Sequence, residues 1–162
     1  ARKIVLLCTQ GQSVAFLTLG DPGLYSTFAY VVRLIRESDP SIPVEIIPGV
    51  MSVSACAAAA GQSLAQAEET LTIQPCSQIL DKRALWWKSF DCVVVMKIGK
   101  KLPYLVKRLQ KLSLLEHAAL VTRAGFESCS IVRGNDLLSC DEQQGYLATM
   151  IVKAGLRGES GF

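Results

Sequence analysis

A short turn rich in glycine carries the first residues that could do chemistry. The sequence Gly-Asp-Pro-Gly at residues 20–23 follows an apolar run at residues 14–19 that is long enough for a buried strand. From Leu24 the apolar residues fall at helical spacing, so the segment is predicted to be strand, turn and helix. In an open α/β sheet such a turn lies at the carboxyl end of a strand, where ligands bind, and the N–H groups that open the helix favour an anionic group.

The same composition also suits an ordinary loop between a strand and a helix. Asp21 could do no more than cap the following helix, because aspartate is a common N-cap residue. The turn alone therefore leaves a ligand loop and a structural loop both open.

Other kinds of chemical site find little support in the sequence. The six cysteines are scattered without CxxC spacing and there is one histidine, so no metal site is expected. Isolated cysteines favour a reducing, cytoplasmic compartment. The net charge of +3 comes from 17 Lys and Arg against 14 Asp and Glu, without a basic cluster. This balance argues against a nucleic-acid partner and suits an acidic small substrate. No apolar run reaches the length needed to span a bilayer, so no membrane partner is expected.

The first part of the chain predicts a β–α–β unit. Its strands are residues 14–19 and 44–47, joined by a helix that runs from Leu24 to Glu37. Residues 1–11 resemble the tail of a helix, and the Ala-rich stretch 54–60 predicts another. The polar stretch 62–69 then separates two predicted domains, residues 1–66 and 67–162.

The second part alternates strands and helices. Strands are predicted at residues 71–73, 92–96, 118–122, 130–133 and 145–152, and helices at residues 78–88 and 100–112. The strands at 118–122 and 130–133 are expected to form a hairpin. Residues 154–162 are expected to be a frayed end. The alternation predicts an α/β fold in two parts.

Several strings, taken in order, resemble one enzyme family. Residues 17–27, Leu-Thr-Leu-Gly-Asp-Pro-Gly-Leu-Tyr-Ser-Thr, resemble the GDPxxY signature of the tetrapyrrole methylases. Four further strings resemble motifs of the same family: Ile-Ile-Pro-Gly-Val-Met-Ser (46–52), Val-Val-Val-Met (93–96), Thr-Arg-Ala-Gly (122–125) and Tyr-Leu-Ala-Thr (146–149). The resemblance spans residues 13–153 in the family's order, which is far more specific than one motif.

The resemblance implies a two-domain α/β/α architecture and an S-adenosylmethionine-dependent methyltransferase of cobalamin biosynthesis. Within the family, the first string is most similar to the members that methylate C20 of precorrin-2 or cobalt-factor II. The cofactor-binding residues that it implies are Leu19, Gly20, Asp21, Leu24, Tyr25, Met51, Ser52, Met96, Gly125, Ala148 and Thr149. Candidates to bind the carboxylates of a tetrapyrrole are Lys97, Lys100 and Arg123. No acid–base residue is assigned, because methyl transfer to an electron-rich carbon depends chiefly on alignment.

One family feature is missing from the sequence. The family opens with a glycine-rich GxGPGD loop after its first strand, and nothing like it occurs here. We therefore expect a truncated N-terminal domain, and self-association, as a homodimer or otherwise, through the unpaired edge at residues 14–19 or the helix at 27–35. Two alternatives remain: a truncated or degenerate, non-catalytic module of the same fold, and a methyltransferase of this fold with another acceptor such as RNA.

Overall fold

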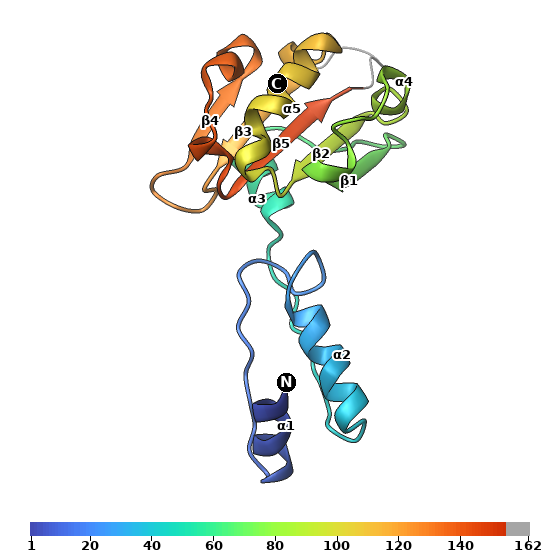
Figure 1. Ribbon diagram of the computed structural model, residues 1–162, viewed down its shortest axis with the longest axis vertical. Helices are drawn as coiled ribbons and strands as arrows, with labels where there is room; N and C mark the ends of the chain where they lie inside the picture. Colours follow the sequence, from blue (N-terminus) through green and yellow to red (C-terminus); the bar gives the residue numbers. More distant parts are fainter. Residues whose placement is uncertain (155–162) are drawn as a thin grey trace. The chain divides into compact units, whose positions relative to one another are not determined.

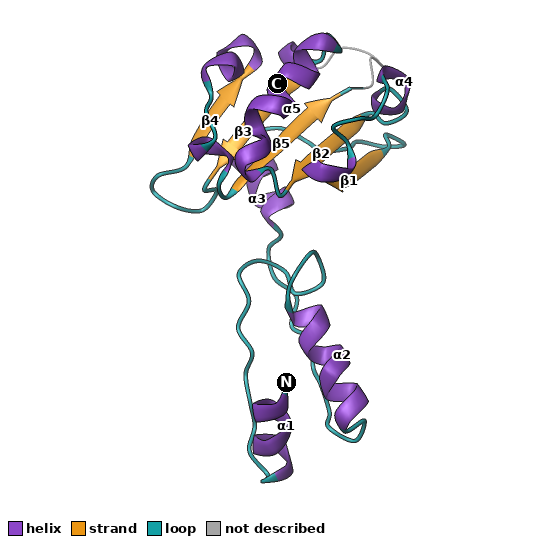
Figure 2. Cartoon of the chain, viewed as in Figure 1, coloured by secondary structure: helices purple, strands orange, loops and turns teal. Residues whose placement is uncertain are grey.

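The computed structural model describes residues 1–154 and divides the chain into two compact units. Unit 1 is Ala1–Ser52 and unit 2 is Val53–Phe162, described as far as Ala154. Figures 1 and 2 show helices joined by loops in unit 1, and a sheet with helices in unit 2. The α/β character of the chain therefore resides in unit 2.

Unit 1 contains helices α1 (Arg2–Thr9) and α2 (Phe28–Ser38), which lie beside each other. Helix α2 begins four residues later than predicted. Tyr25 has a left-handed backbone with φ 53°, and the Phe28 N–H donates to Ser26 Oγ at 3.1 Å, so residues 24–27 form a turn instead of a first helical turn. The Gly-rich turn is thus not directly joined to a helix N-terminus.

The two strands predicted in unit 1 are wrong. Residues 14–19 and 44–47 have no regular secondary structure, and they form no strand and no backbone-to-backbone hydrogen bond among the described residues. Both segments instead line a cavity of about 880 Å³ within unit 1, together with Phe28 and Ile35. Strands are stable only when paired, and here the apolar segments flank an open space. The predicted β–α–β unit is therefore not formed.

Unit 2 is built on one five-stranded sheet with the order β1-β2-β5-β3-β4. Its strands are β1 (Leu71–Pro75), β2 (Cys92–Met96), β3 (Ala118–Thr122), β4 (Ser130–Arg133) and β5 (Ala148–Lys153). β1 and β2 are parallel, whereas β5 runs antiparallel to both β2 and β3, and β3 and β4 form the predicted hairpin. β2 and β3 consequently point the same way.

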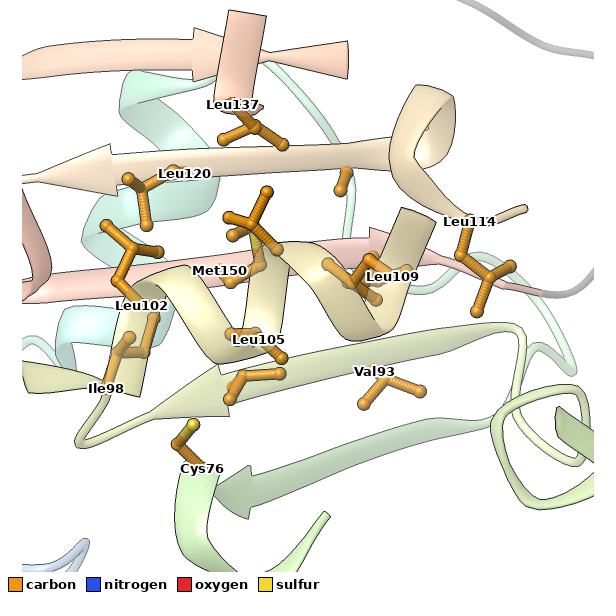
Figure 3. Packing of buried hydrophobic residues seen from close by; sticks show 14 of the residues in the cluster. Cys76, Val93, Ile98, Leu102, Leu105, Leu109, Leu114, Leu120, Leu137 and Met150 are labelled. Atoms are coloured by element: carbon orange, nitrogen blue, oxygen red, sulfur yellow. The ribbon is translucent and has the colours of Figure 1, made fainter. Parts of the chain in front are cut away.

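Helix α5 (Leu102–Lys111) covers one face of this sheet. Its apolar residues Leu102, Leu105 and Leu109 are fully buried, as are Leu120 and Met150 on the strands beneath. Figure 3 shows these side chains pointing into one cluster. A fully buried leucine stabilises a fold by about 1.5–3 kcal/mol, so this face is the main source of stability in unit 2.

Helix α3 (Ser52–Ala59) packs on the opposite face of the sheet. Along β5, Met150 belongs to the cluster under α5, so its neighbours Thr149 and Ile151 face the other way. A side-chain hydrogen bond joins Thr149 to Cys56 of α3, and burial raises the pKa of the Cys56 thiol. Small residues on α3 allow this close approach, as the Ala-rich sequence predicts.

The helix predicted at residues 78–88 is also wrong. The chain forms a 3-10 turn at Cys76–Gln78 and then the four-residue helix α4 (Ala84–Trp87). The Lys82 carbonyl, which would accept a hydrogen bond from Trp86 in a continuous helix, instead accepts one from the Arg108 guanidinium of α5. The Trp86 N–H donates to the Arg83 carbonyl at 3.0 Å, which starts a new turn. The extended backbone of Arg83, with φ −69° and ψ 161°, therefore separates the two turns.

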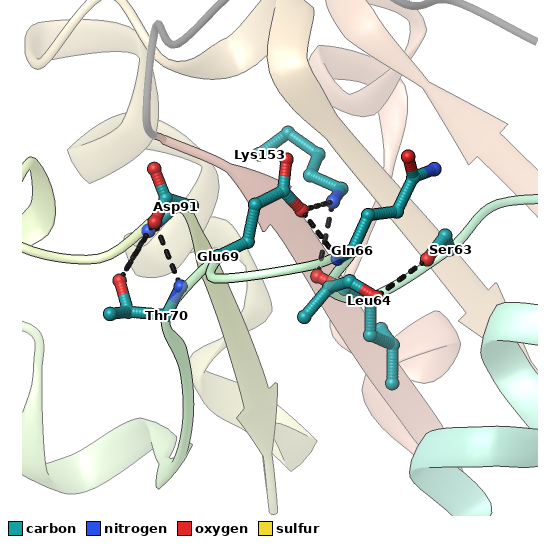
Figure 4. A network of polar contacts seen from close by, with 8 residues as sticks. Ser63, Leu64, Gln66, Glu69, Thr70, Asp91 and Lys153 are labelled. Atoms are coloured by element: carbon teal, nitrogen blue, oxygen red, sulfur yellow. Dashed lines mark hydrogen bonds and ion pairs between the residues drawn. The ribbon is translucent and has the colours of Figure 1, made fainter.

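The polar stretch at residues 62–69 is anchored within unit 2. Lys153 at the end of β5 donates to the Leu64 carbonyl at 3.0 Å and pairs with Glu69 at 3.2 Å (Figure 4). Asp91 accepts hydrogen bonds from the Thr70 N–H and hydroxyl at 2.8 and 2.9 Å. The division after Ser52 differs from the boundary that we expected after residue 66, and the domain limits 1–66 and 67–162 stay a prediction.

Two further results bound the kinds of site available. Within residues 1–154, no helix is long and apolar enough to cross a bilayer. Over the same described stretch, no group of three or more His, Cys, Asp or Glu side chains could hold a metal ion. The frayed end expected at residues 154–162 lies, apart from Ala154, outside the described residues.

Candidate functional site

The candidate residues fall into two groups, one in each unit. Unit 1 holds Leu19, Gly20, Asp21, Leu24, Tyr25, Met51 and Ser52. Unit 2 holds Met96, Lys97, Lys100, Arg123, Gly125, Ala148 and Thr149. The structure brings the members of each group together on neighbouring loops.

In unit 1, the Gly20 turn (residues 20–25) lies against the Pro48 loop (residues 48–52). Asp21 Oδ1 accepts a hydrogen bond from the Gly23 N–H at 2.7 Å, and Oδ2 accepts one from the Gly49 N–H at 2.9 Å. These two N–H donors hold the pKa of the Asp21 carboxyl below its usual 3.8. Both N–H groups are thereby bonded within the protein, so the anion-binding role that we expected for this turn has no support from them.

Backbone meets backbone where these two loops touch. A Cβ at Gly49 would lie 2.6 Å from the Gly20 carbonyl oxygen, so no larger residue fits there. Gly20 itself has φ 82°, a conformation that side chains disfavour. Gly20 was predicted from the sequence as a site residue and Gly49 was not, although the Pro-Gly context of Gly49 marks a tight turn.

The other candidates in unit 1 differ in exposure. Leu19 is 81% exposed and Tyr25 is 43% exposed, whereas Leu24 and Met51 are half-buried. Ser52 is exposed and is the first residue of α3. Large apolar side chains open to solvent are available to cover a ligand or another chain.

In unit 2, three strand ends meet at one edge of the sheet, which we call the rim. β2 ends at Met96 and β3 ends at Thr122, while β5 begins at Ala148. The register pairs Thr122 with Ala148 and Val95 with Met150, so all three ends are level. The Arg123 N–H donates to the Leu147 carbonyl at 2.9 Å and closes the rim between β3 and β5.

A strained backbone conformation occurs at each of these strand ends. Lys97, Arg123 and Leu147 have φ values of 54°, 51° and 50°, in the left-handed region that non-glycine residues seldom adopt. Each such residue costs of order 1 kcal/mol, and residues of this kind cluster at functional sites. Leu147 was missed in the sequence, because an apolar residue gives no sign of a left-handed backbone.

The remaining rim candidates are small, apolar or charged. Met96 is half-buried and Ala148 is buried, while Gly125 has φ 87° and no atom within 4 Å of the place where a Cβ would stand. Thr149 is 3% exposed and its side chain is bonded on the α3 face. Any contact of Thr149 with a ligand at the rim would therefore come from its backbone.

The three candidate cations are all exposed. Lys97 and Arg123 follow the ends of β2 and β3, and Lys100 lies on the 3-10 turn η2 (Gly99–Lys101) that leads into α5. The Arg123 guanidinium donates to Ser128 Oγ at 3.4 Å. The structure thus places two of the three cations directly on the rim and the third within a few residues of it.

Relief of the rim strain should offset the usual cost of introducing glycine. We expect Leu147→Gly to leave the unfolding free energy close to that of the wild type, because glycine adopts a positive φ without a steric penalty of about 1 kcal/mol. The control is Leu138→Gly, which changes an exposed leucine with an ordinary backbone and should lower stability by about 1 kcal/mol. Urea unfolding measures both, and a loss of stability in Leu147→Gly equal to that of the control would contradict stored strain.

Comparison with known proteins identifies the family. Residues 1–135 match the family model of Tetrapyrrole (Corrin/Porphyrin) Methylases. The chain is 37% identical over 147 residues to a probable cobalt-precorrin-2 C(20)-methyltransferase of Methanocaldococcus jannaschii, covering 86% of this chain and 58% of that protein. It is 27% identical over 153 residues to a precorrin-2 C(20)-methyltransferase of a Sinorhizobium species, covering 94% and 60%. The chain thus spans somewhat less than two thirds of these relatives.

Solved structures show the same fold. A cobalt precorrin-4 methyltransferase of cobalamin biosynthesis superposes with a TM-score of 0.76 at 21% identity, over 93% of this chain and 68% of that one. A uroporphyrin-III C-methyltransferase from Thermus thermophilus superposes with a TM-score of 0.70 at 22% identity, over 94% and 69%. With the family model matching most of its length, this chain belongs to the tetrapyrrole (corrin/porphyrin) methylase family.

Proposed function

We propose that this chain belongs to an S-adenosylmethionine-dependent C-methyltransferase of cobalamin biosynthesis that methylates C20 of precorrin-2 or cobalt-factor II. The names of its relatives from Methanocaldococcus and Sinorhizobium support this acceptor. Support for the cofactor comes from a uroporphyrin-III C-methyltransferase of the same fold, TM-score 0.62 at 19% identity, that is complexed with S-adenosylhomocysteine.

The rim of unit 2 carries the proposal. Left-handed residues at three adjoining strand ends turn the chain sharply, and the space beside Gly125 is open where a side chain would otherwise stand. Half-buried Met96 offers a soft apolar surface to an adenine ring. These features fit the apolar and uncharged portion of the cofactor, and Ala148 and the Thr149 backbone would complete its binding surface.

The Gly20 turn and the Pro48 loop of unit 1 are also proposed as cofactor-binding loops. Gly20 allows a ligand close to the main chain, and Leu19, Leu24, Tyr25 and Met51 supply apolar surface around it. The bound cofactor would supply an electrophilic methyl group on sulfur. The residues of this chain would bind and orient it, S-adenosylhomocysteine would leave, and the proton displaced by methylation would pass to solvent.

Lys97, Lys100 and Arg123 are proposed to bind the acceptor. Precorrin-2 and cobalt-factor II are polycarboxylates, and a guanidinium can pair with a carboxylate through two hydrogen bonds. The exposed positions of these side chains at or near the rim support this role. Their contribution would be orientation of the macrocycle and not chemistry on the methyl group.

Calorimetry with S-adenosylhomocysteine tests the cofactor site. We expect Gly20→Val to weaken binding by about tenfold or more, because the branched side chain would occupy the ligand's approach to the backbone. Gly11→Val is the matched control, since Gly11 also lies in unit 1, has φ 77° and has nothing within 4 Å of its Cβ position. Because both positions have a positive φ, valine should destabilise the backbone equally in the two variants, and they should have similar melting temperatures.

The result separates the alternatives. Equal binding by the Gly20→Val and Gly11→Val variants would make the turn structural only. Absence of binding by the wild-type chain would favour the non-catalytic module of the same fold. Binding of the cofactor with methyl transfer to RNA, but none to precorrin-2, would favour the other acceptor, against which the mild charge of +3 argues.

We further propose a cytoplasmic protein that self-associates, as a homodimer or otherwise. The six cysteines are free thiols, and burial raises the pKa of Cys76 and Cys92 to about 11, which suits a reducing compartment. Unpaired apolar segments in unit 1 support self-association.

A further inference from the structure

We propose that Asp21 is a positioning residue that latches the Gly20 turn to the Pro48 loop and holds these two candidate cofactor loops in one arrangement. The importance of this latch for cofactor binding rests on the proposed function, but the latch itself can be measured without a ligand. The family motif implies that Asp21 contacts the cofactor directly, whereas the geometry points to an indirect role.

Each oxygen of the Asp21 carboxylate serves a different loop. Oδ1 accepts from the Gly23 N–H at 2.7 Å within its own turn, and Oδ2 accepts from the Gly49 N–H at 2.9 Å, 28 residues away in sequence. A charged acceptor makes hydrogen bonds roughly twice as strong as a neutral one. One side chain therefore fixes the turn and ties it to the second loop at once.

The two main chains approach each other closely at the latch. A Cβ at Gly49 would meet the Gly20 carbonyl oxygen at 2.6 Å and the Asp21 Cα at 3.5 Å. On the other side of the contact, the Cβ position of Gly20 lies 3.6 Å from the Val50 carbonyl oxygen. No backbone-to-backbone hydrogen bond joins residues 19–24 to residues 47–51 in the described part of the chain. The carboxylate thus supplies the polar link where the two main chains touch.

The charge state of Asp21 agrees with this role. The Gly49 and Gly23 N–H groups lower the pKa of the carboxyl from 3.8, with no charged side chain among the causes. A lowered pKa means that the hydrogen bonds favour the ionised form, so the latch is complete above pH 3.8 and is lost as the pH falls through the lowered value.

Asp39 is the matched control. It also has a lowered pKa, and its Oδ1 accepts hydrogen bonds from the Ser41 N–H at 3.0 Å and the Ser41 hydroxyl at 2.6 Å. All of its bonds are local, whereas those of Asp21 join two loops. Asp21→Ala and Asp39→Ala therefore each remove one carboxylate from unit 1, but only Asp21→Ala also removes the hydrogen bond that links the two loops.

Hydrogen exchange followed by NMR on the chain at neutral pH tests the latch. In Asp21→Ala, the Gly49 amide should exchange about tenfold faster or more, whereas Asp39→Ala should speed exchange only at Ser41. Asp21→Asn should fall between, since its amide oxygen accepts one of the two bonds. An unchanged Gly49 amide in Asp21→Ala would overturn the proposal.

Two further measurements complete the test. On acidification, the Gly23 and Gly49 amide signals should move together with one midpoint below 3.8, and separate midpoints would also overturn the latch. Asp21→Ala should weaken S-adenosylhomocysteine binding by about tenfold, and undiminished binding with faster Gly49 exchange would overturn the positioning role. A wild-type chain that binds no ligand, with Gly49 exchange still dependent on Asp21, would refute the proposed function and leave the latch standing.

Discussion

Replacing Leu17 and Leu19 together by lysine should abolish the self-association that we propose for this chain. These side chains are 90% and 81% exposed on the segment of residues 14–19, whose main-chain N–H and C=O groups have no backbone partner in the described structure. An apolar segment of this kind pairs readily with another chain, and lysine on it opposes pairing by charge. We expect the dissociation constant of the dimer to rise by about tenfold or more.

The control for this prediction is Leu85→Lys in α4. Leu85 is 79% exposed, so it matches the two leucines in exposure while lying in unit 2 on a helix. Light scattering over a range of concentrations measures association of all three proteins. If the wild-type chain is a monomer at every concentration, or if Leu85→Lys dissociates it equally well, the edge at residues 14–19 is not the interface.

The sequence predicted the strands of unit 2 far better than those of unit 1. Strands β2, β3 and β4 occur at the predicted residues, and β2 is an unbroken run of apolar residues buried on both faces. Residues 14–19 and 44–47 have a similar composition, but they have no paired neighbour. Apolar composition reports a preference for burial, whereas a strand also needs partners that a local pattern does not reveal.

The helix at residues 78–88 failed for a different physical reason. Its apolar spacing was adequate, yet Arg83 has an extended backbone and the Lys82 carbonyl accepts a hydrogen bond from Arg108 of α5. A contact with a residue 26 positions away cannot be read from a local pattern. Tertiary contacts commonly override helix propensity in this way.

The candidate site was predicted in part. Family motifs led to Lys97 and Arg123, and the structure places both at strand ends with a left-handed backbone. Leu147 completes the strained set and was not predicted, because conformational strain leaves no mark on residue type. For Asp21, the sequence indicated a ligand loop, and only the coordinates revealed that both carboxylate oxygens are bonded to main-chain N–H groups.

Gly145→Ala should be among the most destabilising single changes in unit 2. Gly145 ends the 3-10 turn η5 (Gln143–Gly145), and a Cβ there would overlap the carbonyl group of Gly99 in η2. The Gly99 carbonyl belongs to the main chain that follows β2, so it cannot move aside as a flexible side chain would. We expect a loss of about 3 kcal/mol in unfolding free energy and a fall in Tm of about 10 °C or more.

Gly99→Ala provides the matched control at the other side of the same contact. The Cβ position of Gly99 has no atom within 4 Å, so its substitution pays only for a backbone with φ 51°, about 1 kcal/mol. Thermal and urea unfolding of both variants measure the difference. Gly99→Ala measures only the cost of a side chain on a left-handed backbone. A larger loss of stability in Gly145→Ala would therefore come from the clash with the Gly99 carbonyl. Equal losses in the two variants would mean that η2 and η5 do not meet main chain to main chain, and the connection between the end of β2 and the start of β5 would need a different account.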